Sequence, residues 1–248
     1  MFVAVASLPA DPAGLQRAAE ITGIAPADAS RLLTGTLPRV LVRATQEGDR
    51  IAGALEAAGF TAFVGEARQI PGDKDRVVAR NLEFTASGFT ALDGRGQRHE
   101  CEANSISVLL RGIRVVETSE VIKTTERKLD LGKAILTSGL AVTKKVETIS
   151  ERMTSSKEPF ILVQRTEGLP GIMLYEGRLN YQCLGPALQH SRSGNFLALL
   201  ARLQTLAPDV PVDDRILRPG FLAGLPLLSS DPADFAVFLV SEARSRGC

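Results

Sequence analysis

The side chains that could do chemistry in this sequence are few and widely spaced. His99 and Cys101 stand two apart, as a metal-binding or nucleophilic pair would on one strand, and the only other histidine is His190. Such a pair needs further ligands or an orienting third group, so a packed histidine beside a buried cysteine is the favoured interpretation. Cys183 and Cys248 have no spacing typical of a metal site or a redox motif. We therefore expect no metal site.

Sequence signatures of catalysis and cofactor binding are also absent. The sequence has no GxGxxG, phosphate-binding loop, GxSxG or HExxH pattern. The glycine-rich stretch 93–96 lies between two expected strands, without a following helix whose amides would hold a phosphate. Asp213, Asp214 and Arg215 lie in a proline-rich connection, where a salt bridge that anchors the loop is the favoured role. We expect no catalytic residue, no cofactor and no enzymatic activity.

The charge balance excludes several kinds of partner. The 248 residues carry 29 Lys+Arg and 28 Asp+Glu, and 44% of the residues are hydrophobic, which is an ordinary soluble composition. No region is basic enough for a nucleic-acid footprint. No segment approaches the roughly 20 apolar residues that span a bilayer, and the first residues lack the basic region of an export signal. We expect a cytoplasmic protein that binds no nucleic acid.

The segment 117–157 differs in composition from the rest of the chain. It holds six of the seven lysines, 12 Ser or Thr residues and no aromatic residue, and we interpret it as a mobile insertion. Three alternatives stay open: a helix or extended segment packed on its own protein, a segment that orders on a partner protein, and a membrane-surface amphipath. The weak net charge of +2 disfavours the membrane surface. For the partner, the expected contact residues here are Leu131, Ile135, Leu136, Leu140, Lys144 and Lys145.

Residues 1–67 alternate strand and helix patterns. The apolar run 2–7 is an expected strand, and Asp11-Pro12 supplies an N-cap followed by proline at the first helical position. Residues 39–43 alternate at the period of two that is typical of a strand. The expected order is strand, helix, helix, strand, helix, strand, and we expect this region to fold by itself.

Two stretches of this region carry a more specific pattern, 22–42 (TGIAPADASRLLTGTLPRVLV) and 55–64 (LEAAGFTAFV). Together they resemble the C-terminal domain of the bacterial ribosomal stalk protein, in pattern and in spacing. In that family a lysine-rich helical face meets translation factors. The corresponding stretch here offers Arg17 and Arg31, which we include among the expected partner-binding residues.

Beyond residue 76 the pattern changes to short strands. An apolar helix follows at 196–206, and a tail helix begins at Asp231-Pro232. Four strands, a long connection, three strands and a helix resemble the pleckstrin-homology-like barrel in element order. The expected strands are 81–85, 88–92, 98–103, 105–117, 159–166, 171–176 and 179–184.

The predicted fold is therefore α+β, with a stalk-like βααβαβ module at 1–67 and a mostly antiparallel pleckstrin-homology-like barrel at 76–248. The barrel carries the insertion 117–157 and C-terminal helices. The predicted function is a non-catalytic adaptor or scaffold that binds another protein. The alternative is a sensor of a small ligand or a lipid headgroup that uses the barrel.

Overall fold

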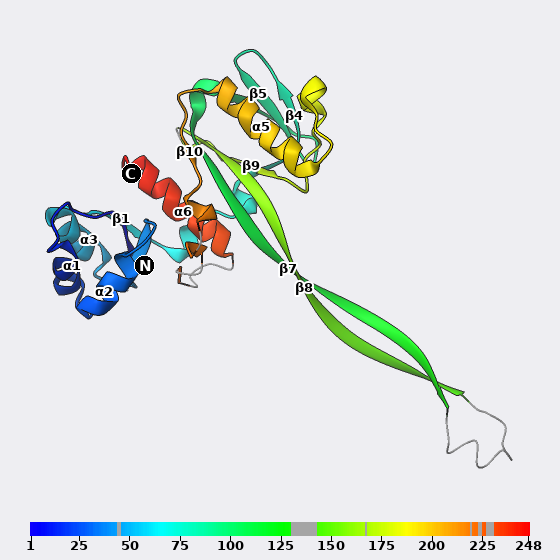
Figure 1. The fold of residues 1–248 in the computed structure, drawn as a ribbon, viewed down its shortest axis with the longest axis horizontal. Coiled ribbons are helices and arrows are strands. Elements are labelled where there is room, and N and C mark those ends of the chain that lie inside the picture. Colours follow the sequence, from blue (N-terminus) through cyan, green and yellow to red (C-terminus); the bar gives the residue numbers. More distant parts are fainter. Residues whose placement is uncertain (44–45, 130–142, 167, 219, 223–224, 227–230) are drawn as a thin grey trace. The chain divides into compact units, whose positions relative to one another are not determined.

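The structure is a computed structural model that describes residues 1–43, 46–129, 143–166, 168–218, 220–222, 225–226 and 231–248. It divides into two compact units: unit 1 is Met1–Arg114 with Glu158–Cys248, and unit 2 is Val115–Lys157. Unit 1 holds a three-stranded antiparallel sheet, most of a seven-stranded mixed sheet, and the helices (Figure 1). The α+β class is therefore confirmed. No helix among the described residues is long and apolar enough to cross a membrane.

The N-terminal elements follow the predicted order. The three strands pair antiparallel in the order β2-β1-β3. Gly23 ends the first helix in the left-handed conformation, with φ of 71°, which glycine adopts without steric cost. The elements are β1 Phe2–Ser7, α1 Gly14–Thr22, α2 Pro26–Leu33, β2 Arg39–Arg43, α3 Gly48–Ala57 and β3 Thr61–Gly65.

Both faces of this small sheet are buried, which explains why β1 is apolar at every position but its last. Val3 and Val5 face the core formed with α1, α2 and α3. Phe2 and Ala4 alternate to the other face and pack against α6 (Pro232–Ser245). A strand that is covered on both sides reads as a continuous apolar run. Whether 1–67 folds by itself remains a prediction, and α6 is what covers its second face.

The larger sheet has the strand order β10-β7-β8-β9-β4-β5-β6. The pairs β10-β7 and β4-β9 are parallel, and the pairs β4-β5, β5-β6 and β8-β9 are antiparallel. The strands are β4 Val77–Phe84, β5 Gly88–Asp93, β6 Arg98–Glu102, β7 Ile106–Leu129, β8 Thr143–Arg165, β9 Ile172–Tyr175 and β10 Val212–Asp213. Short 3-10 helices lie at η1 Ala67–Gln69, η2 Asp73–Asp75, η3 Ala103–Ser105, η4 Gln182–Ala187 and η5 Arg215–Leu217.

The predicted closed barrel is wrong, because the sheet stays open with β10 and β6 at its edges. Helix α5 (Arg192–Leu206) packs on one face through Leu199 and Leu203, and Figure 1 shows it lying over the sheet. Helix α6 packs on the other face through Val237 and Val240. Since helices cover both faces, the sheet buries its apolar residues without closing on itself.

The strand predicted at 179–184 is also wrong, since residues 179–181 have no regular structure and η4 begins at Gln182. The Asn180 side chain accepts a hydrogen bond from the Gln182 N–H at 3.0 Å, which begins a turn in place of a ladder. Leu184 is buried in the core under α5, and Cys183 packs against that core from the edge. Cys183 therefore lies in a 3-10 helix and not in the strand predicted at 179–184.

The long insertion is not a separate segment between two strands. β7 has 24 residues and β8 has 23, and they are neighbours in the sheet, so the strands continue through most of 117–157. The rest of that segment, 130–142, lies outside the described residues. We call the parts of β7 and β8 in unit 2, residues 115–129 and 143–157, the ribbon.

The two C-terminal helices agree with the sequence prediction. Helix α5 ends before Pro208. The Asp231 side chain caps α6 by accepting a hydrogen bond from the Ala233 N–H at 2.7 Å, as the Asp-Pro start predicted. The buried residues of α6 point to both sheets: Phe235 and Leu239 meet the small sheet, while Ala236 and Val240 meet the large one.

A substitution of Phe235 tests the packing of α6 between the two sheets and gives the first prediction. The Phe235 side chain is fully buried, and its ring lies 5.2 Å from that of Phe2 in an edge-to-face contact. We expect Phe235→Ala to lower the free energy of unfolding by about 3–5 kcal/mol, measured by urea denaturation. Leu197→Ala on α5 is the control, because that side chain is 55% exposed, and its effect should stay within about 0.5 kcal/mol. Equal effects would contradict the placement of α6.

Candidate functional site

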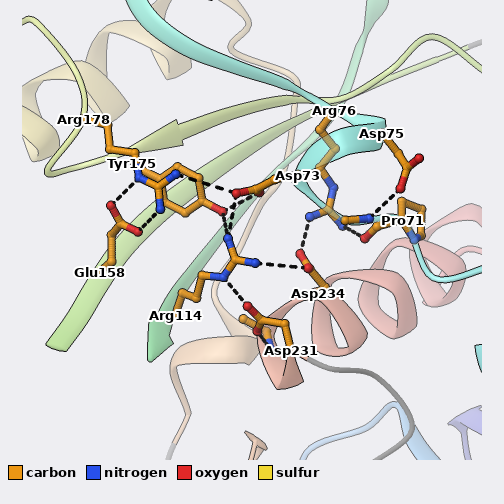
Figure 2. A network of polar contacts seen from close by, with 12 residues as sticks. Pro71, Asp73, Asp75, Arg76, Arg114, Glu158, Tyr175, Arg178, Asp231 and Asp234 are labelled. Atoms are coloured by element: carbon orange, nitrogen blue, oxygen red, sulfur yellow. Dashed lines mark hydrogen bonds and ion pairs between the residues drawn. The ribbon is translucent and has the colours of Figure 1, made fainter. Parts of the chain in front are cut away.

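Charged side chains from several segments of unit 1 form one connected network (Figure 2). At its centre lies Arg114 of β7, whose guanidinium donates to Asp73 at 2.8 Å and to the Tyr175 hydroxyl at 2.6 Å. The same guanidinium donates to Asp231 and, at 3.3 Å, to Asp234. All the nitrogens of Arg114 are therefore used, and its side chain is only 16% exposed.

Tyr175 is held at its hydroxyl and on its ring face. Its hydroxyl donates to Asp73 at 2.6 Å, and the guanidinium of Arg178 lies 4.0 Å from the ring centroid. Arg178 in turn donates two hydrogen bonds to Glu158, at 2.7 and 2.6 Å. This bidentate ion pair fixes the cation in the stacked position.

Arg76 extends the network to the chain before β4. It donates to Asp234 at 2.5 Å and to the carbonyl of Pro71 at 2.8 Å, and its side chain is 5% exposed. The Asp75 carboxylate accepts the N–H of Gly72 at 2.9 Å, which fixes the turn at η2. The stretch 72–75, whose sequence Gly-Asp-Lys-Asp is typical of a linker, is therefore attached to the large sheet through Asp73, and the adjacent Arg76 attaches it to α6.

The positions of these residues follow from their elements. Asp231 caps α6 and Asp234 lies in its first turn, where the helix dipole favours negative charge. Arg114 and Glu158 are the residues at which the chain leaves and re-enters unit 1. The network therefore joins the start of α6 to the two strands that continue into the ribbon.

Burial and neighbouring charges decide the protonation states here. Burial, together with the hydrogen bond to Asp73, raises the pKa of Tyr175 far above its ordinary value. Burial also raises the pKa of Asp234, against the opposing effect of Arg76 and Arg114. Burial alone would lower the pKa of Arg114, but its bonds to Asp231 and Asp73 outweigh this and raise it. The tyrosine therefore stays a neutral hydrogen-bond donor, and the arrangement holds charges in place.

Comparison of the chain with protein-family models, curated proteins and solved structures found no match. The network must therefore be interpreted from its own geometry. Sequence analysis missed it, although one signal was present: the period of two places Arg114 on the strand face of Val108 and Leu110, which is buried. A cation on the apolar face of a strand indicates a buried partner.

The partner-binding residues expected from sequence do not come together in this network. Arg17 on α1 pairs with Asp11 at 2.6 Å, and Arg31 on α2 pairs with Asp28 at 3.1 Å, both at the surface. Leu131, Ile135, Leu136 and Leu140 lie outside the described residues. Lys144 and Lys145 lie on β8, of which only the backbone is described there.

His99 and Cys101, the possible metal-binding or nucleophilic pair of the sequence, have ordinary packing and polar contacts. Cys101 is buried, and burial raises the pKa of its thiol. His99 lies on the same strand with its Nε2 atom 3.5 Å from the Asp93 carboxylate. Among the described residues, no three His, Cys, Asp or Glu side chains are grouped as a metal site would require.

Asp213 performs the anchoring role expected from the sequence. Its carboxylate is 1% exposed and accepts hydrogen bonds from Arg215 at 2.7 Å and from Arg244 of α6 at 2.7 Å. Arg215 also donates to the carbonyls of Leu37 and Cys248, at 3.4 and 3.2 Å. This ion pair therefore ties β10 to α6 and to the N-terminal region.

Arg114 gives the second prediction. Arg114→Ala leaves Asp73, Asp231 and Asp234 without their shared cation, so we expect unfolding to become easier by about 3 kcal/mol in urea. The control is Arg98→Ala, because Arg98 pairs with Glu83 where the side chains are 58% and 53% exposed. That variant should cost less than about 1 kcal/mol. A small effect for both variants would show that the network contributes little to stability.

Asp213 gives the third prediction, a pH dependence. Burial would raise the pKa of its carboxyl, but hydrogen bonds from Arg215 and Arg244 outweigh burial and hold the pKa below its ordinary value. The stabilisation is therefore complete above the unfolded-state pKa of about 3.9 and is lost as pH falls through the folded value. We expect the free energy of unfolding to fall less steeply below about pH 4 in Asp213→Asn than in the wild type. Parallel acid limbs in a urea and pH series would contradict this.

Proposed function

We propose that this protein is a non-catalytic protein-interaction module, an adaptor or scaffold of the bacterial cytoplasm, which contacts its partner through the ribbon. The observation that carries the proposal is the length of β7 and β8, 24 and 23 residues. Strands of globular proteins usually have about five or six residues. Strands of this length are longer than pairing within the large sheet requires, which indicates a further role.

The pairing of these strands supports a contact role. Among the described residues, β10 pairs with β7 only at Leu109 and Leu110, and β9 pairs with β8 only along 160–163. The ribbon therefore consists of two strands without a third. A two-stranded ribbon alone is marginally stable in water, and its open edges offer backbone donors and acceptors to a further strand. Strand addition at such an edge is a common mode of protein recognition.

The composition of this segment agrees with the same role. Six of the seven lysines of the chain lie between Lys123 and Lys157, together with 12 Ser or Thr residues in 117–157. Lysine on an edge strand disfavours indiscriminate pairing with other sheets. The lysines of the ribbon are suited to contact individual carboxylates of a partner protein.

The N-terminal region supports recognition by analogy. Its element order, β1-α1-α2-β2-α3-β3, agrees with the resemblance of 22–42 and 55–64 to the stalk-protein domain, which in its own family meets other proteins. Fold-level analogy carries less weight than a site. Arg17 and Arg31 therefore remain the second choice for partner contact.

A deletion tests the proposal and gives the fourth prediction. Replacing 120–155 by a short Gly/Ser loop keeps Arg114 and Glu158, so unit 1 should stay folded, with an unchanged near-ultraviolet circular dichroism spectrum. We expect the deletion to abolish capture of the partner from a lysate of the native host. The comparison is made at equal bait concentration, with captured proteins identified by mass spectrometry.

Two further variants locate the contact. Lys144→Ala with Lys145→Ala should weaken capture, because it removes two of the ribbon's cations. The matched pair Arg17→Ala with Arg31→Ala removes the same charge from α1 and α2 and should leave capture unchanged. If the deletion variant still captures the same protein, the ribbon is a spacer. If the α1 and α2 variant alone loses it, the contact lies on the N-terminal helices.

The alternative function, a sensor of a small ligand or lipid headgroup, was expected to use the barrel domain. In place of a barrel, the structure has an open sheet that α5 and α6 cover on its two faces. A ligand would need a surface groove instead. One groove of unit 1 has the chemistry for this role.

A further inference from the structure

A groove of about 500 Å³ opens beside the charged network, between η2, β4 and the turn 93–97. This volume suits a small molecule. Five cationic side chains line the groove, against the carboxylates of Asp73 and Asp93. The cations are Lys74, Arg76, Arg80, Arg95 and Arg178.

The cations divide into two that are paired and three that are not. Arg76 and Arg178 are paired with Asp234 and Glu158, as described above, and belong to the fixed wall of the groove. Within the described part of the chain, the side chains of Lys74, Arg80 and Arg95 have no hydrogen bond or ion pair. All three side chains are exposed.

The carboxylates of the groove offset only part of the charge of these three cations. Asp73 is engaged by Arg114 and by the Tyr175 hydroxyl. Asp93 accepts the N–H groups of Gln97 and Arg95, at 2.9 and 2.8 Å, and these bonds lower its pKa. Since N–H groups are neutral, Asp93 keeps its negative charge and has no Arg or Lys side-chain partner among the described residues. Three unpaired cations therefore face one such carboxylate, and the net charge that faces the groove is positive.

Two features of the backbone place these cations. Arg80 lies at a β-bulge, since the pairing of β4 with β5 shifts between Ala79 and Asn81, and the Arg80 carbonyl accepts the N–H of Asn180 at 2.8 Å. Bulges reorient a side chain relative to the regular ladder and are frequent beside binding sites. The turn that carries Arg95 is fixed by the two bonds to Asp93. Two of the three cations therefore come from an ordered frame.

We propose that this groove binds a small ligand through its phosphate groups, with Lys74, Arg80 and Arg95 as the side chains that contact the phosphate oxygens. Phosphate is the anion that arginine and lysine recognise by charge-assisted hydrogen bonds. Three cations around one groove match a ligand with two or more phosphate groups. The site is independent of the ribbon, and its occupation does not require the partner protein.

Isothermal titration of the full chain with sodium tripolyphosphate tests this proposal and gives the fifth prediction. We expect saturable binding that weakens as salt is raised, because the cations are exposed and screened. The triple variant Lys74→Ala, Arg80→Ala, Arg95→Ala should bind about 100-fold more weakly, since three charge-assisted bonds are lost. Its melting temperature should match the wild type, because none of the three side chains has a partner to lose.

A second triple variant distinguishes binding at the groove from the effect of the total positive charge. Arg50→Ala, Arg68→Ala and Arg218→Ala remove the same number of cations from side chains that are 64%, 81% and 57% exposed. This variant should bind tripolyphosphate as the wild type does. Absence of binding by the wild type, or equal losses in both variants, overturns the proposal.

Vesicles identify the source of the phosphate. Vesicles that contain cardiolipin, whose headgroup carries two phosphates, are compared with phosphatidylcholine vesicles in a flotation assay, with the wild type and the groove variant. Flotation on cardiolipin that the groove variant loses supports a lipid headgroup. Tripolyphosphate binding without flotation supports a soluble phosphorylated ligand. Flotation that both proteins share, without tripolyphosphate binding by the wild type, overturns the proposal.

Discussion

The fold depends on α6, a helix that is buried around most of its circumference. Residues on opposite sides of α6, such as Phe235 and Val240, are fully buried, the first against the three-stranded sheet and the second against the seven-stranded one. A helix that is apolar around most of its circumference requires a cover on every side. Each sheet is in turn left with an open apolar face unless α6 occupies it. The two sheets are therefore parts of one folded unit.

The ionic network fixes the position of α6 along its axis. Hydrophobic contact alone does not fix the position of a helix along its axis, because apolar side chains slide at little cost compared with charges. Arg114 can satisfy Asp231 and Asp234 together only when the first turn of α6 lies beside the end of β7 in unit 1. We regard the network as a source of specificity first and of stability second, since buried ion pairs often contribute little net free energy.

Sequence reasoning succeeded where one short stretch carries the whole signal. The run 2–7, the alternation in 39–43 and the Asp231-Pro232 start each indicate their element locally, and the structure confirms all three. It failed at 179–184, because the turn-forming side chain of Asn180 prevailed over the apolar pattern. In 117–157 the distinct composition indicated a mobile insertion, although threonine and valine favour strands.

The network and the groove could not be predicted in the same way. Asp73, Arg114, Tyr175 and Asp234 come from four segments that only the finished fold brings together. The groove depends on which cations are left without an ion pair, and pairing is not visible in a sequence. The net charge of each region of the sequence is close to zero. This sum does not distinguish a carboxylate that is already hydrogen-bonded from a guanidinium that has no partner.

The position of α6 in the chain also sets the order in which the protein can be completed during synthesis. The small sheet is made first, but the helix that covers Phe2 and Phe63 follows only after the large sheet and α5. At about 5–20 residues per second, this apolar face waits on the order of ten seconds on the ribosome. The nascent chain therefore carries an exposed aromatic surface for that time, and it is an expected client of ribosome-associated chaperones.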